Sequence, residues 1–458
     1  MGRREFCSMN ETTPRKTLGR FTAWLHHPFG RQAAHALPFW FASLAVGIVA
    51  VLYTRIFGFG EHLQKEMLHA HPAAVFLLSP LFFLLAWLPV HLWARFARGS
   101  GIPQVMAAID LSVPGHEHKV GKLVSLRVLW VKVVSSFLMV LGGGAIGREG
   151  PTIQISASIF RWVSRRIPQS WPRMARQSFL LTGAAAGLAA AFNTPLGGLV
   201  FAVEELARVH VRYFRTALFT SVIISGLVAQ GLLGPYLYLG YPDVGGLSIR
   251  IFPAVIVVSL LAGAGGAAFC KAILAVLQRT AKFKVWGQVT YIVLAGLAMA
   301  ALCYFVDPGV QGSGKELINR LLFTADKTCG ISTVFLRMIG PLLTFNVGAA
   351  GGVFAPALAS GAAIGGCCSG WFGFGGAAAN VLILAGMVSF LTGVTRTPFT
   401  SAILVLEMTD RHNVIFHLLL AALVASLVAH LVDRHSFYDR MKGRHKAALA
   451  HETADTVG

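Results

Sequence analysis

Several segments of this chain are long enough and apolar enough to cross a lipid bilayer. A crossing helix needs about 20 mostly apolar residues. Charged residues make up only 13% of the chain, against about 25% in an ordinary soluble domain. We therefore expect an all-α polytopic membrane protein, with crossings at residues 37–57, 73–93, 213–238, 255–277 and 414–432.

Other apolar segments are shorter and are interrupted by glycine and proline. Such a pattern is typical of helices that break inside the membrane. Irregular backbone at that depth is tolerated only where it lines a cavity or is buried in protein. A transporter or a channel is therefore favoured over a receptor or an anchor. The short segments are residues 180–192, 195–203, 353–364, 381–391 and 399–406.

The formal net charge of +20 does not indicate binding to nucleic acid, because the basic residues lie mostly in short loops and tails. Residues 161–176, for example, contain five arginines and no acidic residue. Such loops face the cytoplasm by the positive-inside rule. We expect both termini to be cytoplasmic, with a tail at residues 1–36, a membrane domain at 37–445 and a second tail at 446–458.

The chain also resembles itself. A block at residues 181–205 recurs at 384–408 with an offset of 203 residues, and residues 147–151 match 352–356 with an offset of 205. Membrane transporters are often built from such repeats, with the substrate site at their interface. We expect two repeats, at about residues 37–245 and 250–433.

The segment Gly147-Arg148-Glu149-Gly150-Pro151 carries the strongest functional signal. An ionisable side chain within an apolar membrane stretch is costly and indicates a functional site. Proline suits the first turn of a helix, and a helix start attracts anions. The segment therefore predicts an anion site that the carboxylate of Glu149 can also occupy, and from which protonation would release it.

Three glycine- and proline-marked helix starts and one tyrosine together resemble the signature elements of the CLC family of chloride channels and chloride/proton exchangers. The three starts are residues 99–103, 147–151 and 351–356, and the tyrosine is Tyr438. The resemblance extends over about residues 37–445. It implies an inverted repeat of many tilted and broken helices, and a homodimer with one pore per subunit. Within that family, the chain resembles the bacterial-type members, which lie in the plasma (inner) membrane and lack cytoplasmic regulatory domains.

The resemblance also implies roles for individual residues. Glu149 would be the gate, and Glu205 would transfer protons from the inside. The alternative for Glu205 is a surface acid paired with Arg208. The chloride-binding set would be Ser100, Gly101, Ile102, Arg148, Gly150, Val353, Phe354 and Tyr438, with Arg148 shaping the field around the anion.

Two members of that set have simpler alternatives. Ser100 could be a helix N-cap, and Tyr438 an aromatic anchor at the membrane surface. The chain also departs from the family pattern. Gln104 stands where exchangers often have an acid, with Met106 close by. Lys132 lies inside an apolar helix, where a nearby acid would normally pair with it.

The sequence predicts a chloride/proton antiporter, with chloride, protons and the lipid bilayer as partners. The alternative is a passive chloride channel, gated by voltage or pH, on the same fold. An ATP-driven pump is disfavoured, because residues 309–315 resemble a phosphate-binding loop but Glu316 replaces the Ser or Thr that binds magnesium. We expect no enzymatic activity, metal site, cofactor or nucleic acid.

Overall fold

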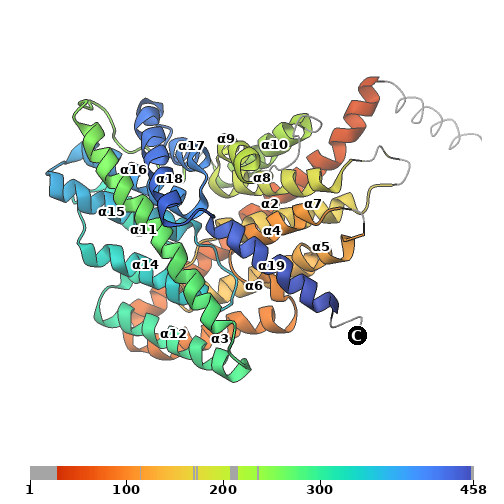
Figure 1. Cartoon of the computed structure of the whole chain (residues 1–458), viewed down its shortest axis with the longest axis horizontal. Coiled ribbons are helices and arrows are strands. Elements are labelled where there is room, and N and C mark those ends of the chain that lie inside the picture. The colour runs from red at the N-terminus through yellow and green to blue at the C-terminus, as the bar shows by residue number, and fades with distance from the viewer. Residues whose placement is uncertain are drawn as a thin grey trace, which may run out of the picture.

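The computed structural model describes residues 28–454, except residues 114, 169–170, 172–173, 207–214 and 235–236. Within this part of the chain the named elements are helices and helical turns (Figure 1). Among the described residues, eight helical segments, some of them made of two consecutive elements, are long and apolar enough to cross a membrane. They cover His35–Ala70, Pro72–Leu92, Glu117–Leu141, Arg215–Leu233, Ile251–Thr280, Val285–Phe305, Gly376–Thr395 and His412–Val432.

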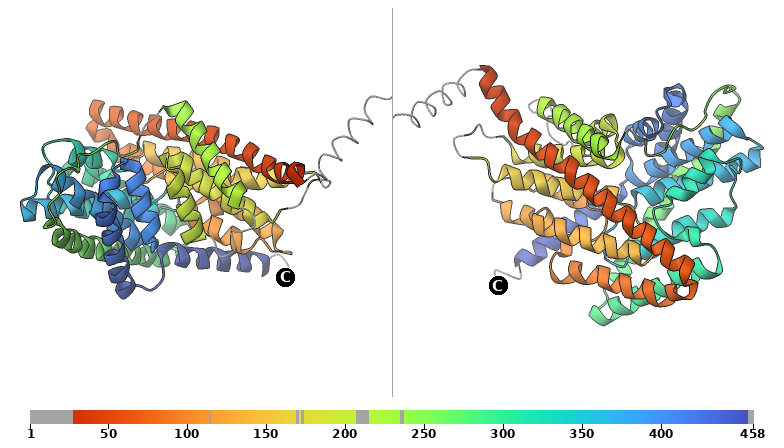
Figure 2. Two further views of the ribbon diagram at one scale, coloured as in Figure 1. Left: turned by 90° about the horizontal axis from the view of Figure 1, so that it is seen from above. Right: turned by 180° about the vertical axis from the view of Figure 1, so that it is seen from behind.

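The first half of the chain forms one side of the molecule in Figure 1. Its longest helix, α2 (Pro28–Ala70), runs obliquely across the back, as Figure 2 shows. The helices that follow are α3 (Val75–Leu92), α4 (Ile102–Asp110), α5 (Glu117–Leu123), α6 (Leu126–Leu141), α7 (Glu149–Ser164), α8 (Arg176–Phe192), α9 (Pro195–Phe201) and α10 (Arg215–Leu233).

The second half forms the other side. Its helices are α11 (Ile251–Thr280), α12 (Val285–Phe305), α13 (Lys315–Phe323), α14 (Ile331–Phe345), α15 (Phe354–Phe372), α16 (Gly376–Thr395), α17 (Pro398–Thr409) and α18 (Ile415–Val432). The last helix, α19 (Phe437–Ala454), crosses in front of the first half in Figure 1 and packs against α4.

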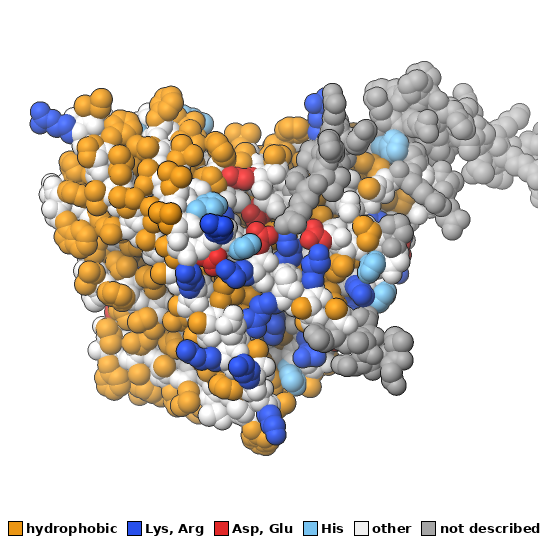
Figure 3. All heavy atoms as spheres, viewed as in Figure 1, with side chains coloured by type: hydrophobic (Ala, Val, Ile, Leu, Met, Phe, Trp, Pro, Cys, Tyr) orange, Lys and Arg blue, Asp and Glu red, His pale blue; other side chains and the backbone are white. Residues whose placement is uncertain are grey.

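The helices are sorted by burial. α8, α15 and α16 are buried along nearly their whole length and are rich in alanine and glycine, which allows close approach of helix backbones in membranes. The outer helices expose large apolar side chains, such as Leu427 and Leu431 of α18. Figure 3 shows these apolar side chains over the α11–α18 side, and Lys and Arg side chains gathered where α19 crosses.

Two predicted segments differ from the structure. Residues 381–391 were expected to be a short, interrupted piece, but they belong to the 20-residue helix α16. Its glycines continue the helix because it packs closely on α11 and α15. The crossing expected at residues 37–57 is part of a longer, 43-residue helix, α2. The expected segment was shorter because only the central part of α2 has the apolar composition that marks a crossing.

Candidate anion and proton site

The three marked loops of the sequence meet at one place. The Gly99 N–H donates to Ala349 O at 2.8 Å, and the Gly351 N–H donates to Gly99 O at 3.1 Å. Gly147 and Gly352 exchange two backbone hydrogen bonds, each 2.8 Å long. Residues that match at an offset of 205 in the sequence are therefore bonded to each other reciprocally, as a local two-fold axis between them would require.

These contacts bring together the starts of α4, α7 and α15. A Cβ atom on Gly150 would lie 2.2 Å from Ser100 Oγ, and one on Gly352 would lie 3.3 Å from Gly150 N. Gly101, which precedes α4, has φ +102°, a conformation that strongly favours glycine. The first N–H groups of a helix have no partner within the helix. Three positive helix ends therefore converge on a small volume.

Two buried hydroxyl groups lie at this place. Ser100 is 2% exposed and Tyr438 is fully buried. The Ser100 and Tyr438 side chains lie near each other, yet neither hydroxyl makes a hydrogen bond to another described protein atom. Ser100 is not the N-cap of α4, because Gly101 occupies that position. Full burial of Tyr438 does not fit an anchor at the membrane surface.

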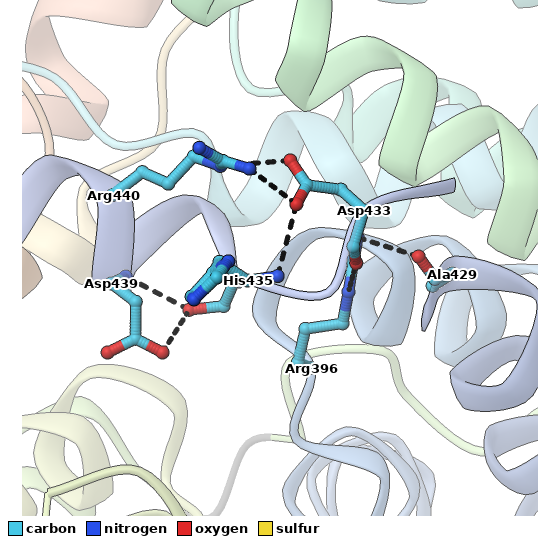
Figure 4. Close-up of polar contacts among 7 residues, drawn as sticks. Arg396, Ala429, Asp433, His435, Asp439 and Arg440 are labelled. Atoms are coloured by element: carbon cyan, nitrogen blue, oxygen red, sulfur yellow. Dashed lines mark hydrogen bonds and ion pairs between the residues drawn. The ribbon is translucent and has the colours of Figure 1, made fainter. Parts of the chain in front are cut away.

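Polar contacts hold the chain segment before α19 in place (Figure 4), and Tyr438 is the second residue of that helix. The Asp433 carboxylate accepts from Arg440 Nε at 2.9 Å and Nη2 at 2.7 Å. The Asp433 carbonyl accepts from Arg396 Nη2 at 3.1 Å. Hydrogen bonding to Arg440 holds the pKa of Asp433, which lies outside the membrane spans, below its usual range.

Glu149 begins α7 and is 1% exposed. Tyr238 Oη donates to Glu149 Oε1 at 3.4 Å. The other carboxylate oxygen lies beside Gly147, where a Cβ would meet both it and Ala355 N of α15. Arg148 and Glu61 act on this carboxylate electrostatically. Neither Tyr238 nor Glu61 was expected at this site from the sequence.

Glu205 lies in a single π-helical turn, η3 (Ala202–Leu206), that continues α9. Such turns occur frequently at functional sites. Glu205 is half-buried and is close enough to Tyr438 to act on it electrostatically. Arg208, the expected surface partner, falls outside the described residues.

Glu204 and Glu407 occupy equivalent positions and make reciprocal contacts. The Glu204 carboxylate accepts from the N–H of Phe399 at 3.1 Å and of Thr400 at 2.6 Å, at the start of α17. The Glu407 carboxylate, near the end of α17, accepts from the N–H of Leu196 at 3.0 Å and of Gly197 at 2.8 Å, at the start of α9. Glu204 therefore caps α17, the helix that carries Glu407. Glu407 in turn caps α9, the helix that leads into the turn with Glu204.

Lys132 has a backbone partner in place of the expected acid. Lys132 is fully buried, and its Nζ donates to Gly99 O at 2.8 Å. This hydrogen bond ties α6 to the loop that presents Ser100. Gln104 is also buried and donates to the carbonyls of Phe96 and Arg98 at 3.2 and 2.7 Å. Lys132 and Gln104 thus both bond to carbonyl groups of the loop before α4 and support it.

The loop at residues 309–314 is organised around a cation. Its carbonyls at Gly309, Gln311 and Gly312 accept from the Arg337 guanidinium of α14 at 2.7, 3.0 and 3.2 Å. A phosphate-binding loop presents its N–H groups to an anion. This loop presents carbonyl groups to an arginine, so the geometry agrees with the rejection of a nucleotide site.

Residues 82–430 match the family model described as voltage-gated chloride channel. An H+/Cl− exchange transporter ClcA of Citrobacter koseri is 32% identical over 385 residues, covering 81% of this chain and 78% of that protein. One of Salmonella typhimurium is 30% identical and covers 89% and 88%. The crystal structure of a slow cyanobacterial Cl−/H+ antiporter superposes with a TM-score of 0.76 at 25% identity, covering 93% and 99%.

Proposed function

This chain belongs to the family of voltage-gated chloride channels, and we propose that it is a chloride/proton antiporter of that family. The observation that carries the proposal is a buried carboxylate, Glu149, beside two buried hydroxyls at converging helix starts. The names of the relatives from Citrobacter koseri and Salmonella typhimurium support exchange rather than passive flow.

Chloride is proposed to bind between the Ser100 and Tyr438 hydroxyls. Both groups can donate a hydrogen bond, and a donor that carries no full positive charge holds a halide without trapping it. The convergence of α4, α7 and α15 supports a contribution from backbone groups at the helix starts. Arg148 would concentrate anions near the site. The backbone contributors are Gly101, Ile102, Gly150, Val353 and Phe354.

Glu149 is proposed to act as the gate. Its carboxylate lies at the start of α7 and beside the start of α15, the region in which an anion would also be attracted. An ionised Glu149 therefore competes with chloride. A protonated Glu149 loses that attraction and leaves the position to the anion. One side chain thus links proton binding to chloride movement.

Glu205 is proposed to deliver protons to this region from the opposite side of Tyr438. Its proximity to Tyr438 and its place in a π-helical turn support the assignment. The caps made by the neighbouring Glu204 fix the turn against α17. Of the two adjacent acids in the turn, Glu204 would hold structure and Glu205 would transfer protons.

We also propose that the chain consists of two repeats, at about residues 37–245 and 250–433. It would form a homodimer with one transport pathway in each subunit. The dimer would lie in a bacterial plasma membrane. The reciprocal pairs Gly147–Gly352 and Glu204–Glu407 support the repeats. Basic residues of α5, α7 and α19 lie on one face, where Lys122 bonds Glu452 at 2.8 Å. The positive-inside rule would make that face cytoplasmic, with both termini on that side.

A paired flux measurement tests the function. Purified protein is reconstituted in liposomes loaded with chloride, the voltage is clamped, and chloride efflux and external pH are recorded together. Uphill chloride movement driven by an imposed proton gradient is expected. Chloride efflux without any pH change would overturn antiport and identify a passive channel.

Two variants test the residue roles. Glu149→Gln should abolish proton movement and leave chloride movement, and continued proton pumping would contradict the gate. Glu205→Gln should abolish proton flux and spare chloride flux, and unchanged proton flux would make Glu205 a surface acid. Glu66→Gln, an exposed carboxylate on α2, is the control.

A further inference from the structure

A small cavity of about 20 Å³ is lined by Glu149 and by a second carboxylate, Glu61 of α2. Tyr238, Ser313 and Lys315 also line it. A space of this size holds about one water molecule, provided that polar groups surround it. Two carboxylates, a phenol, a hydroxyl and an ammonium group meet that condition.

A larger cavity of about 650 Å³ adjoins the small one and shares Glu61, Ser313 and Lys315 with it. Other residues that line the larger cavity, Lys65 and His69 among them, are exposed. Solvent therefore reaches Glu61 through the larger cavity. Glu149, in contrast, is 1% exposed, so the direct approach of bulk water to the gate carboxylate is restricted.

Glu61 is held in place on this route. Ser313 Oγ donates to Glu61 Oε1 at 2.9 Å, and the Ser313 N–H lies 3.4 Å from the same atom. Ser313 belongs to the loop that wraps around Arg337, so α2 and the loop before α13 are joined at Glu61. Both contacts with Ser313 use Oε1, and neither involves Oε2, the oxygen that would take up a proton.

We propose that Glu61 is a proton-relay residue that connects the solvent-filled cavity to Glu149. A proton from solvent adds to the Glu61 carboxylate. The Glu61 O–H bond then breaks as that proton passes to the intervening water, which gives another of its protons to the Glu149 carboxylate. Water is unchanged, Glu61 is again ionised and Glu149 is neutral. The reverse sequence releases the proton. This inference rests on the proposed gating role of Glu149.

Other charged and titratable groups surround the two carboxylates. Arg148, Tyr238, Tyr53 and Tyr438 lie within electrostatic range of Glu149. Lys315 and Arg337 lie within range of Glu61, and Lys315 also within range of Glu149. Substituting any of these groups would alter the pH dependence of transport without testing the relay, so the experiment changes Glu61 alone.

The Glu61→Gln variant removes proton transfer at this position while it preserves the hydrogen bond that holds the side chain in place. Glutamine keeps an acceptor oxygen for Ser313 but cannot carry a proton. In the liposome assay the proton and chloride fluxes should both fall by about 10-fold or more while their ratio stays constant, because a positioned proton-transfer group contributes about 100-fold or more. Glu61→Asp, which retains a titratable carboxyl, should recover part of both fluxes. Glu66→Gln should match the wild type.

The Glu149→Gln background provides the decisive comparison. That variant needs no proton at the gate, so adding Glu61→Gln should leave its chloride flux unchanged. An equal fall of chloride flux in this background would overturn the relay and assign Glu61 a structural or electrostatic role. Wild-type fluxes in Glu61→Gln alone would also overturn it. A wild-type protein that moves no protons would instead refute the proposed antiport, and the two failures are distinguishable.

Discussion

Loss of one of the two reciprocal helix caps should destabilise the protein by an amount that the structure sets. Glu407→Ala removes two hydrogen bonds from a carboxylate to the start of α9, 3.0 and 2.8 Å long. A hydrogen bond to a charged group contributes about 1.5–3 kcal/mol. Leu196 at this helix start is 56% exposed, so water can replace part of the lost bonding.

Measured losses of helix N-caps are about 0.5–2 kcal/mol. We therefore expect Glu407→Ala to lower the free energy of unfolding by about 2 kcal/mol, within the range set by the cap value and the two charged bonds. Glu204→Ala should cost more, about 3 kcal/mol, because Glu204 accepts three bonds, including those from Thr400 N and Oγ1 at 2.6 and 2.7 Å. Glutamine at either position should have an intermediate effect.

The assay is denaturant unfolding of the purified protein in detergent, followed by tryptophan fluorescence. Both caps join the same two helices, so the double variant should lose less than the sum of the single losses. Glu66→Gln, on an exposed part of α2, serves as the reference. Single variants that unfold within about 0.5 kcal/mol of the reference, the usual range for surface substitutions, would refute the reasoning.

Three further perturbations have defined outcomes. Lys132→Met leaves the Gly99 carbonyl buried without its donor, and should lower the unfolding free energy by about 1–3 kcal/mol while weakening chloride binding in calorimetry. Gly150→Ala places a Cβ 2.2 Å from Ser100 Oγ, and should weaken chloride binding while leaving expression intact. The pKa of Asp433 is lowered in the folded state, so its stabilising effect is present above its unfolded pKa of about 3.9 and is lost as the pH falls through the folded value. The stability difference between wild type and Asp433→Asn should therefore be constant above about pH 5 and shrink on acidification below about pH 4, and a difference that grows on acidification would contradict the assignment.

Much of the fold could be predicted because apolar length is a strong signal. Each of the five crossings expected from the sequence overlaps an apolar helix of the structure, although the bounds differ. The expected breaks were harder to locate. Residues 381–391 contain glycine and looked interrupted, yet α16 continues through them. Packing against α11 and α15 decides that outcome, and such packing has no local signature in the sequence.

Within the site, the residues at marked helix starts were predictable because their chemistry is tied to a local motif. Glu149 and Ser100 belong to this group. Tyr238 was missed, since it follows no motif and reaches Glu149 from 89 residues away. The backbone partner of Lys132 was missed because a carbonyl carries no sequence signal. Glu61 had a usable signal, because an acid beside an apolar helical stretch is itself unusual.

The reciprocal bond between Gly147 and Gly352 also has a consequence for biosynthesis. Gly352 is made 205 residues after Gly147, and a ribosome adds about 5–20 residues per second. The first half of the chain therefore remains in the bilayer for about 10–40 seconds with the backbone groups of Gly147 unmatched. The start of α9 waits longer still, until Glu407 is made. Neither half contains a complete pathway, so this interval is when chaperones and membrane proteases would recognise an unfinished chain.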